Sequence, residues 1–283
     1  MAIHLVYRSS GKENTKPRPR FYSKALALAS FLRAVDQSSE VVNVIFLNDA
    51  PIPRGTLKMM GKAGEVLNRN GLTLERSYRE AITLPLERGW PSSDLVYLSE
   101  DDYLFRPEAF TRLARAARDI PQAAYFAFYA STATEQRRLP TAHGDWRLAE
   151  STTSSFGARI SVLAADRWLH LIGCRAEGDF DRAICMAYAG RRPYSWQEVP
   201  SNVGAGAGLK ATTARVLGRA TLNLGSYRAR RQCRLLVTEL PSLATHMEEP
   251  HLAEGVNWAE VATDTNLWAE QRGFSLDPAA GSS

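Results

Sequence analysis

The first hundred residues alternate between short apolar segments and longer amphipathic ones, and this alternation constrains the fold more than any other feature. Three segments are apolar, as buried strands are: 3–7, 41–49 and 94–99, and 41–49 is also rich in β-branched residues. Between them, 21–35 and 75–89 carry apolar residues at the spacing of a helix face. Strands that alternate with helices are typical of doubly wound sheets. We therefore predict an α/β fold with a Rossmann-like, doubly wound, mostly parallel sheet.

The chain beyond residue 105 follows a less regular pattern. Helices are predicted over 107–120, 161–173, 179–190 and 257–273, and strands over 123–131 and within 146–161. Residues 191–235 contain many Gly and Arg residues and are not assigned to any element. Because we find no flexible linker, we expect one compact body with two contiguous halves, residues 1–105 and 106–283.

Polar side chains follow three of the predicted strands. They are the stretch from Arg8 to Arg20, the pair Asn48 and Asp49, and the stretch from Glu100 to Asp102. Ligands of open α/β sheets bind beyond the carboxyl ends of the strands. If the strands are parallel, these three stretches meet at one edge of the sheet and form its binding site.

The run Glu100, Asp101 and Asp102 places three like charges side by side, which costs stability unless positive charge lies nearby. One interpretation is a solvated loop or a helix start, where acidic residues are common. The other is a site for Mg²⁺ or Mn²⁺, which prefer oxygen ligands and use one or two carboxylates together with substrate phosphates. The apolar strand that precedes Glu100 favours the second interpretation.

Two further groups of residues are candidates for the same site. The loop 7–24 is dense in Lys and Arg, so it is either a solvated loop or a clamp for a diphosphate. Asp179 and Asp181 precede or open a predicted helix, where each serves either as an N-terminal cap or as a general base. His246 is either structural or, if it folds back toward Asp102, a ligand for a metal or a phosphate.

Composition limits the other classes of function. The formal net charge of +5 favours anionic ligands without requiring nucleic acid. Residues 199–238 contain seven basic residues and no acidic one, so they form either an exposed basic face or a surface for a phosphate, an anionic acceptor or nucleic acid. The chain lacks the HExxH, GxSxG and CxxC motifs of zinc proteases, elbow-type serine hydrolases and structural zinc sites.

The cysteines, the first residues and the length of the apolar segments indicate where the protein is expected to be located. Three cysteines form neither a CxxC pair nor an even disulfide framework, which favours a reducing compartment. The first residues do not have the pattern of a signal peptide, and no apolar segment approaches the ~20 residues of a membrane helix. We expect a cytoplasmic protein without a membrane span.

These motifs together resemble nucleotide-sugar-dependent glycosyltransferases of the glycosyltransferase A fold, of the family-2-like kind with a DxD-type motif. "EDDY" (100–103) stands at the end of a strand about a hundred residues into the chain, where that family has its acidic motif. "GDFDRAI" (178–184) is similar to the acidic helix start of inverting members, although Gly178 stands where they have Glu. "LATH" (243–246) is similar to the late His that completes their metal site.

The resemblance implies roles for these residues. Residues 1–105 would bind a nucleoside diphosphate sugar, such as a UDP- or GDP-sugar, and 106–283 would bind the acceptor. Asp102 and His246 would hold Mn²⁺ or Mg²⁺, and Asp179 or Asp181 would be the catalytic base of an inverting transfer. The residues implied in donor binding are Tyr7, Arg8, Asn48, Asp49, Glu100 and Asp101.

Two other functions stay open at this point. A nucleotidyltransferase would use a similar sheet and metal, but "SSGKENTKPR" (9–18) has one Gly and matches its Gly-rich signature poorly. A nucleic-acid-binding protein would use the basic segment 199–238, and its binding would weaken steeply with salt. A glycosyltransferase that acts on modified bases in DNA would combine both features. The acceptor is unknown, and it is either anionic or DNA if the basic segment contacts it.

Overall fold

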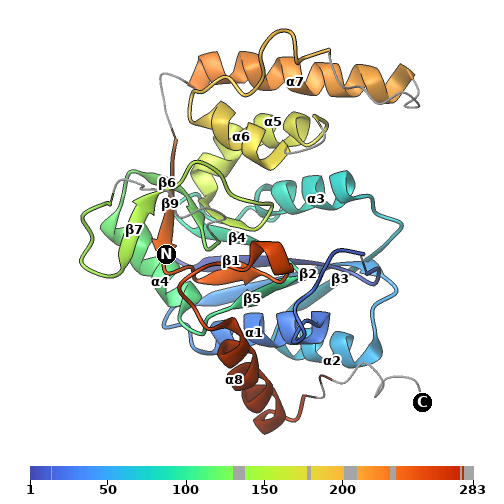
Figure 1. The fold of residues 1–283 in the computed structure, drawn as a ribbon, viewed down its shortest axis with the longest axis vertical. Helices are drawn as coiled ribbons and strands as arrows, with labels where there is room; N and C mark the ends of the chain where they lie inside the picture. Colours follow the sequence, from blue (N-terminus) through green and yellow to red (C-terminus); the bar gives the residue numbers. More distant parts are fainter. Residues whose placement is uncertain are drawn as a thin grey trace.

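The computed structural model describes residues 1–13, 15–129, 138–176, 180–200, 209–229, 234–274 and 276. Within these residues, eight strands form one sheet in the order β3-β2-β1-β4-β8-β6-β9-β7 (Figure 1). Their bounds are β1 (Ile3–Ser10), β2 (Val42–Ala50), β3 (Glu65–Asn70), β4 (Leu95–Glu100), β6 (Ala123–Ala127), β7 (Asp145–Leu148), β8 (Phe156–Arg159) and β9 (Leu235–Leu240).

The sheet is mostly parallel, as predicted. Strands β3, β2, β1 and β4 run parallel to one another, with Arg8 of β1 beside Glu100 of β4. β8 runs antiparallel between β4 and β6, and β7 runs antiparallel at the edge beside β9. β8 therefore continues the sheet from the first half of the chain into the second, across residue 105.

A second, two-stranded sheet joins distant parts of the chain. In it, β5 (Tyr103–Phe105) pairs antiparallel with β10 (Ala244–His246), so that Tyr103 stands opposite His246. The single turn η1 (Glu249–His251) follows directly. This pairing brings the residues after β4 to a segment near the end of the chain.

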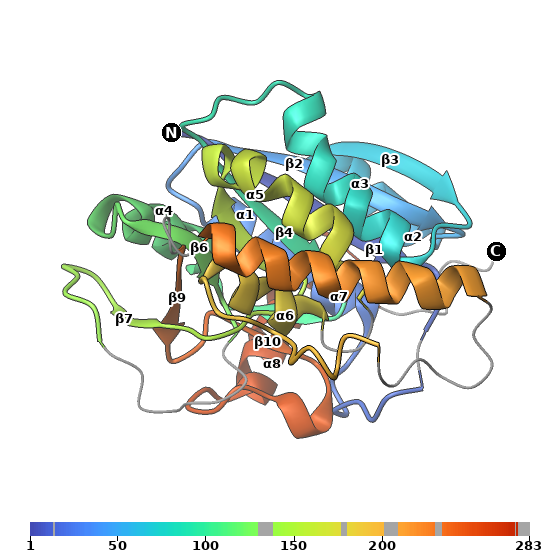
Figure 2. The same ribbon diagram turned by 90° about the horizontal axis from the view of Figure 1, so that it is seen from above.

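Helices cover both faces of the large sheet (Figure 1). On one face lie α1 (Lys24–Asp36), α2 (Arg54–Ala63), α4 (Ala109–Asp119) and α8 (Trp258–Gln271). On the other lie α3 (Leu74–Glu87), α5 (Ile160–Gly173) and α6 (Phe180–Tyr188), and α7 (Leu209–Ala229) forms an outer layer across α5 and α6 (Figure 2). Among the described residues, no helix is long and apolar enough to cross a bilayer.

Side chains of the central strands point alternately to the two faces of the sheet, and a hydrophobic core lies on each face. Leu5 and Tyr7 of β1 are buried against the α1 side, whereas Val6 between them is buried against the α3 side. Leu95 and Tyr97 of β4 face the same side as Leu5. A strand places successive side chains on opposite faces, so a strand buried on both faces reads as a continuous apolar run. This is why these strands could be predicted from composition.

Most boundaries differ from the prediction by a few residues, and two of these differences are described here. β1 extends to Ser10, so Arg8 lies inside the strand and not in the loop after it. β6 ends at Ala127 instead of continuing to residue 131, of which 130 and 131 lie outside the described residues.

The unassigned segment 191–235 contains the long helix α7. A side chain at Gly218 would approach the backbone N of Ala176 to 3.0 Å, and one at Gly225 would overlap Leu169 and Trp168 of α5. Glycine usually weakens helices, which is why this segment stays unassigned from its sequence. In the structure, both glycines allow α7 to pack closely on its neighbours.

A buried carboxylate in β9 makes stability depend on pH. Glu239 is 4% exposed, and among the described residues its Oε2 has no hydrogen-bond partner. Burial raises its pKa to about 7 from the ordinary value of 4.5, although Arg112 lies 3.5 Å away. The folded protein therefore holds this proton up to a higher pH than the unfolded chain does, so stability falls as pH rises from 4.5 to 7.

We expect Glu239→Gln, which mimics the protonated acid, to remove this loss. The variant should exceed the wild type by about 2–3 kcal/mol in free energy of unfolding at pH 8 and by much less at pH 4.5. Urea unfolding at both pH values measures the difference, with Glu87→Gln on the exposed end of α3 as the control. An equal gain at both pH values would contradict the assignment.

Candidate functional site

A cavity of about 330 Å³ opens at the carboxyl ends of β1, β2 and β4. We call it the rim cavity. It is lined by residues from β1 and the loop after it, from the ends of β2 and β4, and from the start of α3. The lining comprises Arg8, Ser9, Ser10, Lys12, Arg18, Lys24, Asp49, Leu72, Thr73, Leu74, Ser77, Glu100, Asp101 and Asp102. The predicted convergence of three polar stretches at one edge of the sheet is confirmed.

Glu100, the last residue of β4, is paired with Arg8. The Nη2 atom of Arg8 donates to Oε1 of Glu100 at 2.9 Å, and the Arg8 side chain is 4% exposed. The Glu100 N–H donates to Ser155 Oγ at 3.0 Å. Burial raises the pKa of Glu100, and the charge of Arg8 opposes that rise. Arg8 therefore compensates a carboxylate that would otherwise be costly to bury.

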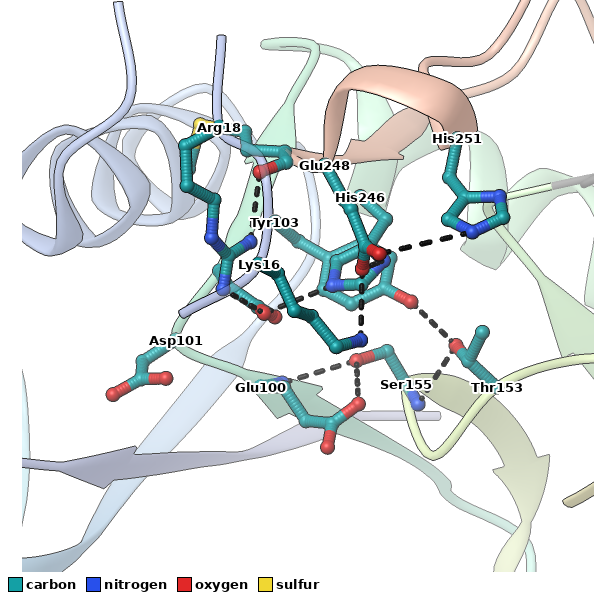
Figure 3. Close-up of polar contacts among 12 residues, drawn as sticks. Lys16, Arg18, Glu100, Asp101, Tyr103, Thr153, Ser155, His246, Glu248 and His251 are labelled. Carbon is teal, nitrogen blue, oxygen red and sulfur yellow. Dashed lines mark hydrogen bonds and ion pairs between the residues drawn. The ribbon is translucent and has the colours of Figure 1, made fainter. Parts of the chain in front are cut away.

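Asp101 turns away from Glu100 (Figure 3) and is held by the loop after β1 and by α1. The Ser10 N–H donates to its Oδ2 at 2.8 Å, and Lys24 Nζ lies 3.0 Å from the same atom. Burial raises the pKa of Asp101, while Lys24 and the Ser10 N–H act against the increase. Lys24 also donates to two backbone carbonyls, those of Ser10 and Lys12, and so ties this loop to the acidic run.

Asp102 is the carboxylate of the three that most favours its ionised form. Its Oδ2 is 2.9 Å from Nε2 of His246 and accepts from Nη2 of Arg18 at 3.1 Å. Burial would raise its pKa, but the hydrogen bonds and charges of His246 and Arg18 outweigh burial and keep the pKa below its ordinary value. His246 thus folds back toward Asp102, which is the condition under which the sequence made it a candidate ligand.

The His246 ring is held from two sides. It stacks on Tyr103, with ring centroids 5.1 Å apart, and its Nδ1 lies 3.5 Å from Oε2 of Glu248 (Figure 3). Lys16 in turn contacts the same Glu248 oxygen at 2.8 Å. Histidine ligands of metals commonly have a carboxylate on their other ring nitrogen, which fixes the orientation of the ring. Glu248 and Tyr103 therefore direct Nε2 of His246 toward Asp102.

The donor atoms at this point suit a hard divalent ion only in part. Asp102 and His246 offer two ligands, and Glu100 and Asp101 face their own cations. Within the described ranges, no group of three or more His, Cys, Asp or Glu side chains is arranged to hold a metal ion. Mg²⁺ and Mn²⁺ commonly combine one or two protein ligands with waters and substrate phosphates. These residues therefore fit an ion that is shared with a phosphorylated substrate.

A buried hydrogen-bond chain supports Arg8 from behind. The Arg8 guanidinium lies 5.5 Å from the centroid of the Tyr78 ring. The Tyr125 hydroxyl donates to Asp166 at 3.0 Å, so it accepts from Nε2–H of His170, and Nδ1 of His170 accepts from Tyr78 at 2.8 Å. Burial lowers the pKa of His170 to about 3, so the ring is neutral near pH 7 and matches this pattern.

Asp181, one of the two predicted bases, lies in α6, where it lines a small separate cavity and not the rim cavity. Its Oδ1 accepts from Ser154 Oγ at 3.0 Å, and the adjacent Ser155 contacts Glu100. A small cavity beside Asp181 is lined by Tyr78 and Thr153, among other residues. Residues 154–155 thus connect Asp181 to the acidic run through consecutive side chains. The other candidate, Asp179, lies outside the described residues.

Two of the predicted donor-binding residues do not line the rim cavity. Tyr7 is 1% exposed and packs between Phe31 and Phe46, because it points to the opposite face of β1 from Arg8. Asn48 is fully buried and donates to Asn68 Oδ1 at 3.2 Å. Asp49 does line the cavity, where its Oδ1 accepts from the Leu72 N–H at 3.0 Å.

Sequence reasoning missed the side chains that orient the site. Ser155 and Glu248 contact Glu100 and His246 and belong to no motif, and Tyr103, which stacks on His246, was noted only as part of "EDDY" and without a role. The pairing of β5 with β10 would have indicated Tyr103 and Glu248, but strands of three residues leave little periodicity to detect.

The basic segment 199–238 uses part of its charge inside the fold. Arg234 makes two hydrogen bonds to Asp166, at 3.1 and 3.3 Å, and Arg219 donates to the Glu198 carbonyl at 2.8 Å. Arg230 and Arg231 lie outside the described residues. Through these contacts Arg234 and Arg219 stabilise the fold. Nucleic-acid binding by the segment stays a prediction.

No protein-family model matches the chain. No curated protein matches it either. Among solved structures, a 4-diphosphocytidyl-2C-methyl-D-erythritol synthase is 15% identical, with a TM-score of 0.40, over 76% of this chain and 97% of that one. A CMP:2-keto-3-deoxy-manno-octonic acid synthetase complexed with CTP is 11% identical, with a TM-score of 0.43, over 96% and 100%. A cytidylyltransferase from Leptospira borgpetersenii serovar Hardjo-bovis is 11% identical, with a TM-score of 0.36, over 59% and 64%. Likenesses this remote do not transfer an activity to this chain.

Proposed function

We propose that this protein is a transferase that binds a nucleotide substrate through its phosphates in the rim cavity. The observation that carries this proposal is the pairing of each carboxylate of the acidic run with a separate cation. Arg8, Lys24 and Arg18 hold Glu100, Asp101 and Asp102, and all six side chains line one cavity. Cations already positioned by carboxylates are well placed for phosphate groups, and Arg suits bidentate contacts.

Glycosyl transfer from a nucleoside diphosphate sugar is the first candidate reaction. In this proposal Arg8, Arg18 and Lys24 bind the diphosphate, and Asp49 contacts the nucleoside. Asp181 Oδ1 takes the proton of the acceptor hydroxyl, and the oxygen then attacks the anomeric carbon as the bond to the diphosphate breaks. Attack on the face opposite the diphosphate inverts the configuration at that carbon. Ser154 orients Asp181 through the hydrogen bond at 3.0 Å.

A divalent ion has a defined place in this proposal. Asp102 and His246 would hold Mn²⁺ or Mg²⁺ together with the substrate phosphates, and the ion would stabilise negative charge on the leaving diphosphate. Glu248 and Tyr103 keep the His246 ring in place for this role. Because the chain supplies two ligands at this point, we expect weak metal binding without nucleotide and strong binding with it.

Nucleotidyl transfer from a nucleoside triphosphate is the second candidate. Four cations line the rim cavity: Arg8, Lys12, Arg18 and Lys24. This number of positive charges also suits three phosphates. In that reaction the acceptor oxygen attacks the α-phosphorus, and diphosphate leaves. Asp181 would again be the group that accepts the proton of the acceptor.

Thermal unfolding with Mn²⁺ and a panel of nucleotides tests the proposal. A ligand at 100 times its dissociation constant adds about 2.7 kcal/mol to stability, which raises the melting temperature measurably. We expect an increase that needs both Mn²⁺ and one nucleotide, and that is lost in Asp102→Ala. Asp264→Ala, an exposed carboxylate of α8, is the control and should keep the increase.

The same panel separates the two reactions. Diphosphate sugars and triphosphates that stabilise the protein are then incubated with it, and the products are identified by mass spectrometry. Release of a nucleoside diphosphate from a diphosphate sugar supports glycosyl transfer, and release of inorganic diphosphate from a triphosphate supports nucleotidyl transfer. No increase in melting temperature with any nucleotide, in folded protein, would overturn both.

A further inference from the structure

A second cavity, of about 530 Å³, lies beside the rim cavity and has no role in the proposed function. We call it the side cavity. It is formed by the loop after β1, the starts of α1 and α2, and the segment after α8 that includes Phe274. α1 and α2 lie next to each other on the same face of the sheet (Figure 1). The volume is in the range of small-molecule sites.

We propose that the side cavity binds an organic anion that carries an apolar or aromatic body. Three lysines line the cavity, Lys24, Lys58 and Lys62, against one acidic residue, Glu13. The Glu13 carboxylate accepts from the Tyr22 hydroxyl at 2.8 Å, so part of its hydrogen-bonding capacity is already used. The charge of the lining therefore favours a negative ligand.

Lys58 and Lys62 differ from Lys24 in their surroundings. Lys24 is held by Asp101 and two carbonyls, whereas Lys58 and Lys62 are exposed and form no ion pair with the described acidic residues. They lie four residues apart on α2, so both side chains lie on one face of that helix. This face carries two cations whose counter-ion must come from outside the described protein.

The start of α2 adds positive potential at the same cavity, whereas at the start of α1 the Ser23 side chain already accepts from the Leu26 N–H. The first turns of α1 and α2 contain no acidic residue. The N-cap of α2 is Pro53, which provides no side-chain hydrogen bond, and Gly55 and Thr56 of that first turn line the cavity. N–H groups at a helix start have no partner inside the helix, and anions bind there readily. Here this feature adds to the lysines and the cavity.

Apolar side chains form the other wall. Met59 is 3% exposed and packs in the core beneath α2, and Tyr22, Ile52, Phe274 and Leu276 complete the lining. The Lys62 Nζ lies 5.3 Å from the Phe274 ring centroid, which places a cation against the apolar wall. A ligand that satisfies both walls needs an anionic group and an apolar body in one molecule.

The side cavity is separate from the nucleotide site, although Ser9, Ser10 and Lys24 line both. Glu100, Asp102 and Arg18 belong to the rim cavity alone, whereas Lys58, Lys62 and Phe274 belong to the side cavity alone. Variants can therefore affect one cavity at a time, and the inference does not depend on which reaction the rim cavity supports.

The fluorescent probe 8-anilinonaphthalene-1-sulfonate has the required chemistry, an aromatic body with one anionic group. We expect one saturable site on the full chain. Lys58→Ala/Lys62→Ala should weaken binding about tenfold, the effect of one lost charge-assisted contact. Inorganic phosphate should compete with the probe in the wild type and have little effect in the double variant.

Two controls make the test specific. Arg115→Ala/Arg167→Ala removes two exposed cations from other helices and should leave probe binding unchanged. Ser77→Ala alters the rim cavity in α3 and should also leave it unchanged. Equal weakening by Arg115→Ala/Arg167→Ala, an equal loss in Ser77→Ala, or no loss in Lys58→Ala/Lys62→Ala would each overturn the proposal.

Discussion

Asp181→Asn should lower kcat of the transfer reaction by about 10²–10⁴-fold, because a general base contributes rate factors of that size. Asparagine keeps the shape of the side chain and can still contact Ser154, but it cannot take the proton of the acceptor hydroxyl. In the proposed function nucleotide binding depends on residues of the rim cavity, so the metal-dependent increase in melting temperature should persist. Steady-state kinetics and thermal unfolding of the same preparation measure both effects.

Asp179→Asn is the matched variant for this experiment. It changes the other acidic residue of the sequence "GDFDRAI" in the same way. If Asp181 is the base, Asp179→Asn keeps most of the rate. A full rate in Asp181→Asn together with a loss in Asp179→Asn would assign the base to Asp179 instead. Ser154→Ala should cause a smaller loss than Asp181→Asn, since Ser154 positions the carboxylate and does not transfer the proton.

Arg8→Ala is expected to destabilise the folded protein by about 3 kcal/mol. The change removes the charge that compensates Glu100 and leaves a carboxylate buried without its cation, which costs 3–5 kcal/mol in comparable pairs. Ser155 Oγ still lies 3.5 Å from Glu100 Oε2, and the Glu100 side chain is 26% exposed, so the lower end of that range applies. Urea unfolding near pH 7 measures the loss.

Two further variants test the cause of this loss. Arg8→Ala/Glu100→Gln removes the uncompensated charge and should recover a large part of the stability. Arg88→Ala breaks the exposed pair with Glu65 and should cost at most about 1 kcal/mol. If Arg8→Ala costs no more than Arg88→Ala, the ion pair with Glu100 does not stabilise the fold as inferred.

Much of the fold could be predicted because its central strands are buried on both faces. Continuous apolar runs and regular spacing identified β1, β2 and β4, and the parallel direction then placed Arg8, Asp49 and the acidic run at one edge. The strand ends pointed to Asn48 and the family resemblance to Tyr7 as donor-binding residues, but neither lines the rim cavity. Proximity along a strand does not imply a shared face, since successive side chains point in opposite directions. Tyr7 precedes Arg8 and therefore enters the core.

The parts that could not be predicted depend on contacts between distant segments. α7 contains two glycines that weaken the helical pattern of the sequence. In the structure they allow close packing against α5, and a local sequence pattern cannot indicate that contact. From the sequence, a divalent metal ion is the expected positive charge that compensates Glu100, Asp101 and Asp102. In the structure, Arg8, Lys24, Arg18 and His246 contact them, and three of these four belong to the first 24 residues.

The pairing of β5 with β10 has a consequence for biosynthesis. Asp102 and His246 are 144 residues apart in the chain. A protein emerging from the ribosome can form the sheet of β1, β2, β3 and β4 long before His246 has been made. The site is therefore completed late. A nascent chain that stalls or is truncated before residue 246 would carry the acidic run without the histidine and Glu248.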